Sequence, residues 1–226
     1  MRALLDLFFP PRCPGCRELI AGAGPFCARC LETLAEVPLA CCPRCGEPEA
    51  LEICEHCRGA PPAFEKASAP YLHGGALADA IHRLKYEDRP HLAAPLASLV
   101  LARLAPELDW CEIVVPVALH PNRLRKRGYD QALLIARELA RRTHKEVVAR
   151  AVKRVRDTPP QVGRDRAQRA ANVMGAFAAD AQKVAGRRVL LVDDVLTTGA
   201  TAQAAARALV DAGARAVRVV ALARAG

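Results

Sequence analysis

Aromatic side chains are scarce in this chain: Phe, Tyr and Trp together make up only 4% of its 226 residues. Proteins dedicated to single-stranded nucleic acids stack the bases on aromatic side chains, so a chain this poor in aromatics does not favour a base-stacking platform. Tyr86 and Tyr129 stand near basic residues and are the two candidates for stacking. Packing in the core is an equal alternative for each of them.

Long apolar segments are missing as well. The apolar run near the start, residues 3–9, is interrupted by Asp6 and ends at Pro10, whereas a membrane-spanning helix needs roughly 20 apolar residues. The start also lacks the strongly basic segment and the small-residue cleavage site of a secretory signal. We therefore expect a soluble, cytoplasmic protein without a membrane span.

Acidic side chains are sparse in residues 120–170, which contain 15 Lys or Arg against 5 Asp or Glu. Such a local excess favours an anionic partner, either a phosphorylated small molecule or a nucleic-acid backbone. A basic cluster begins this stretch: Arg123, Arg125, Lys126 and Arg127. These side chains are candidates to contact DNA phosphates or to clamp pyrophosphate, and a solvated helix face is the alternative.

The ten cysteines are unevenly distributed, since nine of them lie within residues 13–57 and eight of those nine form CxxC pairs. Two intervening residues let both thiolates of a pair reach one ion, and four thiolates make a closed tetrahedral zinc site with no position for a substrate. In a reducing compartment this spacing indicates metal rather than disulfides or redox-active pairs. The pairs form a first quartet of Cys13, Cys16, Cys27 and Cys30 and a second quartet of Cys42, Cys45, Cys54 and Cys57. We predict two structural Zn²⁺ sites, and the spacing leaves open whether the pairs combine sequentially or cross-brace.

The turn-rich segment 59–62 marks the expected domain boundary, because it follows the last cysteine pair and precedes the first helical pattern. We expect a cysteine-rich zinc module at 1–60 and a main domain at 61–226. Apolar spacing in the main domain predicts helices over 74–86, 92–104, 132–140 and 202–212. Apolar runs predict buried strands over 113–115, 187–192 and 217–222. The order of these elements favours an α/β fold, a doubly wound and mostly parallel sheet.

A polar turn follows the predicted strand at 187–192. It begins with Asp193 and Asp194 and enters the next helix through Thr197, Thr198, Gly199, Ala200 and Thr201. Carboxylates at a strand end can accept hydrogen bonds from ribose hydroxyls or hold hydrated Mg²⁺. The N–H groups, hydroxyls and helix N-terminus of such a turn can surround a phosphate. The turn therefore predicts a phosphoribose site, and an ordinary capped turn is the alternative. Because no Lys or Arg lies within four residues of either acid, the sequence leaves both acids unpaired.

The segment 189–201 resembles the 13-residue signature of type I phosphoribosyltransferases, in which an apolar strand precedes two acids and a phosphate loop. This resemblance implies that the chain binds 5-phosphoribosyl 1-pyrophosphate together with Mg²⁺. It places the loop that contacts pyrophosphate at Pro116, Val117, Ala118 and Leu119. It also places a mobile flap at 154–169, with Arg154 and Arg164 among its basic contacts.

A wider resemblance covers nearly the whole chain. The cysteine pairs, the Leu84-Lys85-Tyr86 motif, residues 115–131 and residues 156–161 together resemble the ComF family. That family is associated with DNA uptake in natural competence and with the use of external DNA. The resemblance implies a phosphoribosyltransferase-like domain behind a double zinc ribbon, with Lys85 among the basic contacts. It also implies single-stranded DNA as a partner and competence-machinery proteins as further candidates.

Three positions depart from the usual patterns of these families. Ala118 replaces the second proline of a V-P-V-P motif, and Asp130 stands where ComF proteins usually have Asn. Purine phosphoribosyltransferases often have an acid at the position of Thr197. Without that carboxylate, proton transfer to or from a purine has no obvious agent.

Three functions therefore stay open. In the first, the chain binds phosphoribosyl pyrophosphate and single-stranded DNA in the uptake or use of external DNA. If it is an active enzyme, Asp193 and Asp194 orient the ribose while the anomeric bond breaks through a cation-like transition state. In the second, it is a catalytically inactive phosphoribose sensor or a nucleic-acid-binding adaptor. In the third, it is a nucleobase-salvage phosphoribosyltransferase. The fold by itself does not choose among them.

Overall fold

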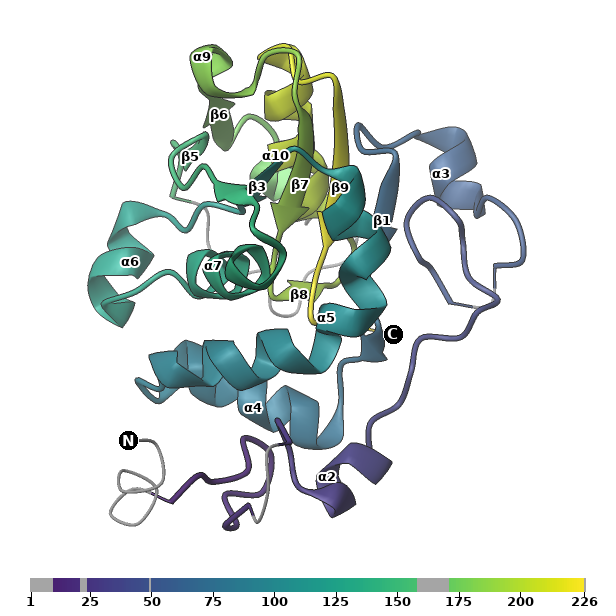
Figure 1. The fold of residues 1–226 in the computed structure, drawn as a ribbon. Helices are drawn as coiled ribbons and strands as arrows, with labels where there is room; N and C mark the ends of the chain where they lie inside the picture. The colour runs from purple at the N-terminus through teal and green to yellow at the C-terminus, as the bar shows by residue number, and fades with distance from the viewer. Residues whose placement is uncertain (1–9, 21–23, 49, 158–170, 226) are drawn as a thin grey trace.

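The main domain is built on a parallel sheet (Figure 1). The structure is a computed structural model, and it describes residues 10–20, 24–48, 50–157 and 171–225. The five strands of the sheet are ordered β1 (Lys66–Ser68), β9 (Ala216–Val220), β7 (Arg188–Val192), β3 (Ile113–Pro116) and β4 (Glu146–Val147). Every pairing between them is parallel. The predicted α/β fold with a mostly parallel sheet is confirmed.

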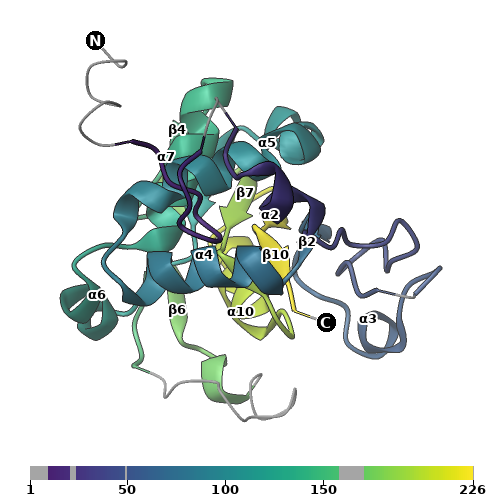
Figure 2. The ribbon, with the colours of Figure 1, turned by 90° about the horizontal axis from the view of Figure 1, so that it is seen from below.

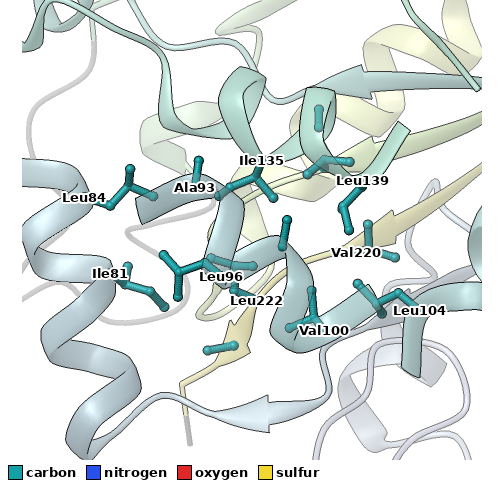
Figure 3. Packing of buried hydrophobic residues seen from close by; sticks show 14 of the residues in the cluster. Ile81, Leu84, Ala93, Leu96, Val100, Leu104, Ile135, Leu139, Val220 and Leu222 are labelled. Atoms are coloured by element: carbon teal, nitrogen blue, oxygen red, sulfur yellow. The ribbon is translucent and has the colours of Figure 1, made fainter. Parts of the chain in front are cut away.

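The central strands are apolar throughout because both faces of the sheet are covered. Along β7, Leu190 and Val192 point into one buried cluster, and Val189 and Leu191 point into the other. Successive side chains of a strand alternate between faces, so a strand buried on both sides shows a continuous apolar run rather than an alternating one. Figure 3 shows part of the first cluster, in which residues of α4, α5 and α7 gather with Val220 and Leu222.

Four helices correspond to the predicted spans, and two of these continue further, whereas the helices Pro121–Arg127 and Ala181–Val184 were not predicted. The helices of the main domain include α4 (Gly75–Tyr86), α5 (Ala93–Trp110), α6 (Pro121–Arg127), α7 (Gln131–Thr143), α9 (Ala181–Val184) and α10 (Ala200–Asp211), with the short 3₁₀ turn η1 (Pro90–Leu92) before α5. Helix α5 runs past Pro106 to Trp110. A proline inside a helix removes one backbone hydrogen bond, and here the last turn also buries Glu107 and Leu108. Within the described part of the chain, no helix is both long and apolar enough to cross a bilayer.

Two smaller sheets accompany the main one. The first contains β2 (Tyr71–Leu72), β10 (Ala223–Arg224) and β8 (Val195–Leu196), which pair in parallel in that order. The second is the antiparallel pair of β5 (Val152–Arg154) and β6 (Phe177–Ala179). Sequence patterns do not predict these strands, because two or three residues are too few to show a period.

The order of connections in the main sheet reverses between β3 and β7, so that the next strand is added on opposite sides of this pair. After β3 the chain passes through α6 and α7 to β4, whereas after β7 it passes through α10 to β9 on the opposite side. In doubly wound sheets, ligands bind beyond the carboxyl ends of the strands at such a switch point. The loops after Pro116 and Val192 leave from this place, since these two residues are register partners.

The two quartets are built alike. In the first, the N–H of Cys13 donates to the carbonyl of Glu18 at 2.8 Å, and in the second the N–H of Cys42 donates to the carbonyl of Glu47 at 2.8 Å. Each quartet also ends in a short helix, α2 (Ala28–Glu32) or α3 (Glu55–Gly59), whose N-cap is a cysteine of the quartet. The module is therefore a repeat of one cysteine-knuckle unit.

The two units dock at different places (Figure 1). The first packs on α4 so closely that a Cβ on Gly15 would lie 2.7 Å from the Cβ of Ala76. The buried Cys13 belongs to the same cluster as the inner face of α4. The second lies against β1, where the N–H of Ala67 donates to the carbonyl of Arg44 at 2.8 Å. Both units are thus braced by the main domain.

Candidate phosphoribose site and metal centres

A cavity of about 310 Å³ opens at the switch point. The loop after β3 contributes Val117, Ala118 and Leu119 to its wall, and the turn after β7 contributes Asp193 and Asp194. The two loops are joined by the N–H of Val117, which donates to the carbonyl of Val192 at 2.8 Å. The structure therefore brings the predicted pyrophosphate loop and the predicted acids to one cavity. Pro116 ends β3 just before it.

Asp130 holds the first of these loops. This residue is the N-cap of α7, and its carboxylate accepts a hydrogen bond from the N–H of Leu133 at 3.1 Å. Its second oxygen accepts from the N–H of Leu119 at 3.3 Å. Burial raises the pKa of Asp130, although the hydrogen bond from Leu133 opposes that shift. The acid that departs from the usual family pattern thus ties the loop to a helix start.

Asp193 is half-buried in the cavity wall. Its N–H donates to the carbonyl of Val220 at 2.9 Å, and its carboxylate accepts from the N–H of Asp194 at 2.8 Å. These bonds fix the backbone as it leaves the sheet. Burial and, secondly, the adjacent carboxylate of Asp194 raise the pKa of Asp193 to about 7. This carboxylate is therefore only partly ionised near neutral pH.

Asp194 is paired, contrary to the expectation that both acids lack a partner. It is 4% exposed, and its carboxylate lies 2.6 Å from the Nζ of Lys85 on α4. The amide of Gln131 on α7 donates to its other oxygen at 2.8 Å. Burial lowers the pKa of Lys85, but the carboxylate of Asp194 outweighs it and the net shift is upward. Lys85, expected as a basic contact, thus stands in the cavity wall as the partner of Asp194.

The hydroxyl-rich turn is divided between two cavities. Thr197 and Thr201 line the main cavity, whereas Thr198, Gly199 and Ala200 line a second cavity of about 200 Å³. Gly199 has a φ of 76° and is the N-cap of the twelve-residue helix α10. Gly199 has no side chain to cap that N-terminus, and the hydroxyl of Thr198 accepts a long hydrogen bond of 3.4 Å from the N–H of Ala200. The next N–H groups of the first turn are suited to an anion.

The predicted basic residues are also divided. Arg123, Arg127 and the buried Arg154 line the main cavity, whereas Arg125 and Lys126 are exposed on α6. Burial lowers the pKa of Arg154, and the positive charge of Arg123 lowers it further. The structure therefore collects three guanidinium groups at the cavity. Arg164 and residues 158–169 of the predicted flap lie outside the described residues.

The residues that line the cavity but were missing from the predicted site include two with polar side chains, His73 and Gln131. His73 lines the cavity at the end of β2, and burial followed by the charge of Lys85 lowers its pKa. No sequence signal identifies it, because it lies between elements that are distant from the acids along the chain. Gln131 lines the cavity too, and its place in the segment 115–131 was the one available signal.

The thiol groups of each quartet converge on one point. All four sulfur atoms of a quartet lie within 4.8 Å of one another. The Sγ atoms of Cys16 and Cys27 are 3.7 Å apart, and those of Cys45 and Cys54 are 3.6 Å apart. Tetrahedral zinc with Zn–S bonds of about 2.3 Å requires sulfur separations of about 3.8 Å. The clusters are therefore compatible with two zinc ions, and the pairs combine sequentially.

Backbone N–H groups favour the thiolate at one cysteine of the second quartet, Cys42, whereas burial raises the pKa of Cys45 to about 11. Burial alone would raise the pKa of Cys42, but the N–H donors of Cys45, Cys54 and Arg44 lower it to about 6. One of these bonds is from the N–H of Cys54 at 3.4 Å. A thiolate is the form that binds zinc.

A switch-point cavity that combines an acidic turn, a helix N-terminus and arginines, carried behind two cysteine clusters, defines a phosphoribosyltransferase-like domain with a double zinc ribbon. Family comparisons agree with this class. The phosphoribosyl transferase domain matches residues 127–226, and the double zinc ribbon domain matches residues 4–61.

Relatives of known name cover almost the whole chain. DNA utilization protein YhgH of Escherichia coli (strain K12) is 32% identical, over 96% of this chain and 99% of that protein. Competence protein F of Haemophilus influenzae is 31% identical over the same shares of both chains. Competence protein ComFC of Bacillus subtilis (strain 168) is 23% identical, over 83% of this chain and 78% of that protein. The chain belongs to the ComF family.

Proposed function

We propose that the chain binds phosphoribosyl pyrophosphate with Mg²⁺ in the switch-point cavity and takes part in DNA uptake or in the use of external DNA. The observation that carries the proposal is the position of Asp193. It lines one cavity together with the loop after β3, with Thr197 and Thr201 of the hydroxyl-rich turn, and with three arginines. A ligand with two anionic groups on either side of a diol matches this arrangement.

Each part of the ligand has a counterpart in the cavity. Asp193 accepts hydrogen bonds from the ribose hydroxyls. Thr197, Thr201 and the N-terminus of α10 hold the 5′-phosphate. The N–H of Ala118 and the guanidinium of Arg123 hold the pyrophosphate, since the N–H groups of Val117 and Leu119 already donate to Val192 and Asp130. Mg²⁺ that enters with the ligand supplies countercharge to the pyrophosphate.

If the site is catalytic, its residues act by position and charge. Asp193 orients the ribose, and its negative charge stabilises the cation that develops at the anomeric carbon. A phosphoribose sensor would use the same residues for binding alone. Nucleobase salvage is less well supported, because Thr197 offers no carboxylate for the base's proton.

Single-stranded DNA is the proposed macromolecular partner. The exposed Arg125 and Lys126 on α6 lie next to the cavity residues Arg123 and Arg127, so one basic surface leads from solvent to the cavity. Tyr86 stands at the same place, 67% exposed, with the guanidinium of Arg127 5.3 Å from its ring centre. The names of the relatives, which refer to DNA utilization and competence, favour this partner over other nucleic acids.

Calorimetric titration of the zinc-loaded chain with phosphoribosyl pyrophosphate and Mg²⁺ tests the proposal. Loss of a charged hydrogen-bond acceptor costs about 2 kcal/mol, so Asp193→Asn is expected to weaken binding about 30-fold. Asp211→Asn changes an exposed acid at the other end of α10 and is expected to bind like the wild type. Equal affinity of the two variants would remove Asp193 from the site.

A second measurement separates the enzyme from the sensor. The chain is incubated with phosphoribosyl pyrophosphate and, in turn, nucleobases, ammonia or DNA oligomers, and pyrophosphate is measured by mass spectrometry. Release that requires one acceptor defines an enzyme. Binding without release defines the sensor.

A further inference from the structure

The second quartet and the phosphoribose site are connected through one buried arginine. We propose that Arg224 is a positioning residue that couples metal binding at the second quartet to the order of the phosphate turn, 195–201. Because that turn forms part of the phosphoribose cavity, the importance of this coupling for the ligand rests on the proposed function. The coupling itself is a property of the protein without ligand.

The side chain of Arg224 is held by the second quartet. Arg224 is 4% exposed, and its Nη1 donates to the carbonyl oxygen of Cys45 at 2.7 Å. Its other terminal nitrogen pairs with the carboxylate of Glu47. Gly46, between these two partners, approaches β1 so closely that a Cβ there would lie 3.0 Å from the carbonyl oxygen of Ala67. The cysteine knuckle therefore has little room to move relative to Arg224.

The backbone of Arg224 is hydrogen-bonded to residues that line the phosphoribose cavity. It lies in β10, the central strand of the small sheet, and its register partner in β8 is Leu196. Its carbonyl accepts a hydrogen bond from the N–H of His73 at 2.6 Å, and the next N–H, that of Ala225, donates to Leu196 at 2.8 Å. His73, Ala225 and Thr197, which follows Leu196, all line the main cavity. One residue thus joins the knuckle to the strand that begins the phosphate turn.

Away from Arg224, the second quartet and the phosphate turn are separated by a cavity. Cys45 and Cys57 lie on the wall of the 200 Å³ cavity that Thr198, Gly199 and Ala200 also line. Arg224 lines this cavity as well, so its side chain bridges the quartet and the turn along one edge. In Figure 2, α3 of the second quartet lies at the right of the view, on the side of β10 and the C-terminus. Helix α2 of the first quartet lies beside α4.

Metal binding at the second quartet keeps the partners of Arg224 in place. The shape of a small cysteine module depends on its metal, so the carbonyl of Cys45 and the carboxylate of Glu47 lose their positions when the metal leaves. A buried guanidinium that loses its partners is strongly unfavourable, and β10 and β8 then loosen around it. The first quartet contacts α4 instead, since Arg83 donates to the carbonyl of Pro14 and Arg17 pairs with Glu87 at 2.6 Å. Its metal is therefore expected to act on α4 and not on the phosphate turn.

Amide hydrogen exchange of the full chain tests the coupling without any ligand. Cys54→Ser/Cys57→Ser empties the second quartet, and Cys27→Ser/Cys30→Ser empties the first as the matched control. The second-quartet variant is expected to exchange about tenfold faster at 195–201, a shift of about 1.4 kcal/mol in local opening. The control is expected to exchange faster within 75–87 instead. Equal effects of both variants at 195–201, or none, would overturn the proposal.

A milder variant extends the test to the ligand. Because Arg224 is buried and its replacement threatens folding, Glu47→Gln removes only the charge that faces it, and Glu52→Gln changes an exposed acid of the same module. With two zinc ions retained, Glu47→Gln is expected to bind phosphoribosyl pyrophosphate about fivefold more weakly, and Glu52→Gln normally. Normal binding by both variants would contradict the link through Arg224. If the wild type binds no phosphoribosyl pyrophosphate, the proposed function fails, while hydrogen exchange still decides the coupling.

Discussion

Lys85 and Asp194 form a 2.6 Å ion pair that joins the C-terminal turn of α4 to the turn after β7. Asp194 is 4% exposed, so its charge is compensated mainly by this lysine and by the amide of Gln131 at 2.8 Å. Because the ion pair involves only Asp194, the two adjacent acids have different surroundings. Asp194 is held within the cavity wall, and Asp193 is the acid proposed to bind the ligand.

Removal of the lysine is expected to destabilise the fold. Lys85→Met leaves the buried carboxylate of Asp194 without its cation, at a cost of about 3 kcal/mol in the free energy of unfolding. Lys85→Met/Asp194→Asn removes both charges and should recover more than half of that loss. Lys183→Met breaks a surface pair with Asp180 and should cost less than about 1 kcal/mol. Urea denaturation measures all three, and equal losses for the single and double variants would contradict the pairing.

Ligand affinity is expected to depend on pH through Asp193. With a pKa of about 7, its ionised fraction rises about tenfold between pH 6 and pH 8. Affinity for phosphoribosyl pyrophosphate should rise by the same factor if the carboxylate receives the ribose hydroxyls. Titrations of the wild type and of Asp193→Asn across this range provide the measurement. The ligand's own ionisation affects both proteins, so only the difference between them counts.

The carboxyl group of Asp193 is expected to make the folded state less stable as the pH rises, whereas ligand affinity rises. A carboxyl group whose pKa is raised in the folded state binds its proton more tightly there than in the unfolded chain. The contribution of Asp193 to stability is thus fully present below its ordinary pKa of 3.8 and is lost as the pH rises through about 7. Thermal unfolding of Asp193→Asn should show a smaller loss of stability across this window. If the stability of variant and wild type changed with pH in the same way, the carboxyl group of Asp193 would not have the raised pKa.

The two tyrosines considered for stacking are expected to behave differently. Tyr86 is 67% exposed, whereas the hydroxyl of Tyr129 donates to the carbonyl of Leu84 at 2.5 Å. Tyr86→Ala should weaken binding of single-stranded DNA by about 1–3 kcal/mol with little change in stability. Tyr129→Phe should lower stability by about 1 kcal/mol and leave DNA binding unchanged. Fluorescence anisotropy and urea denaturation distinguish the two outcomes.

The exposed basic residues of α6 are expected to contribute the salt dependence of DNA binding. Each phosphate contact on a single strand adds about 0.7 to the slope of log affinity against log salt. Arg125→Ala/Lys126→Ala should therefore flatten the slope by about 1.4, without changing affinity for phosphoribosyl pyrophosphate. Arg207→Ala/Arg215→Ala removes two other exposed arginines as the control. An unchanged slope in the α6 variant would exclude this surface.

Local patterns predicted the scaffold well. The strand at 187–192 and the helix after Gly199 could be read directly, because apolar period and turn chemistry act within a few residues. The helix predicted over 92–104 was too short, because Pro106 looks like a stop until the burial of Glu107 and Leu108 is known. The small sheet of β2, β10 and β8 was missed, because its pairing joins distant segments of the chain.

What the sequence alone determined is the chemistry that neighbouring residues define: thiolates at metal-binding spacing, and two acids before a hydroxyl-rich turn. Tertiary structure decided how those groups are combined. It combined the cysteine pairs sequentially and paired Lys85 with Asp194. It also placed Arg224 where it bonds to both Cys45 and His73. Spacing along a chain limits which groups can meet within a turn, whereas partners from distant segments meet only when the packing of the core brings their elements together.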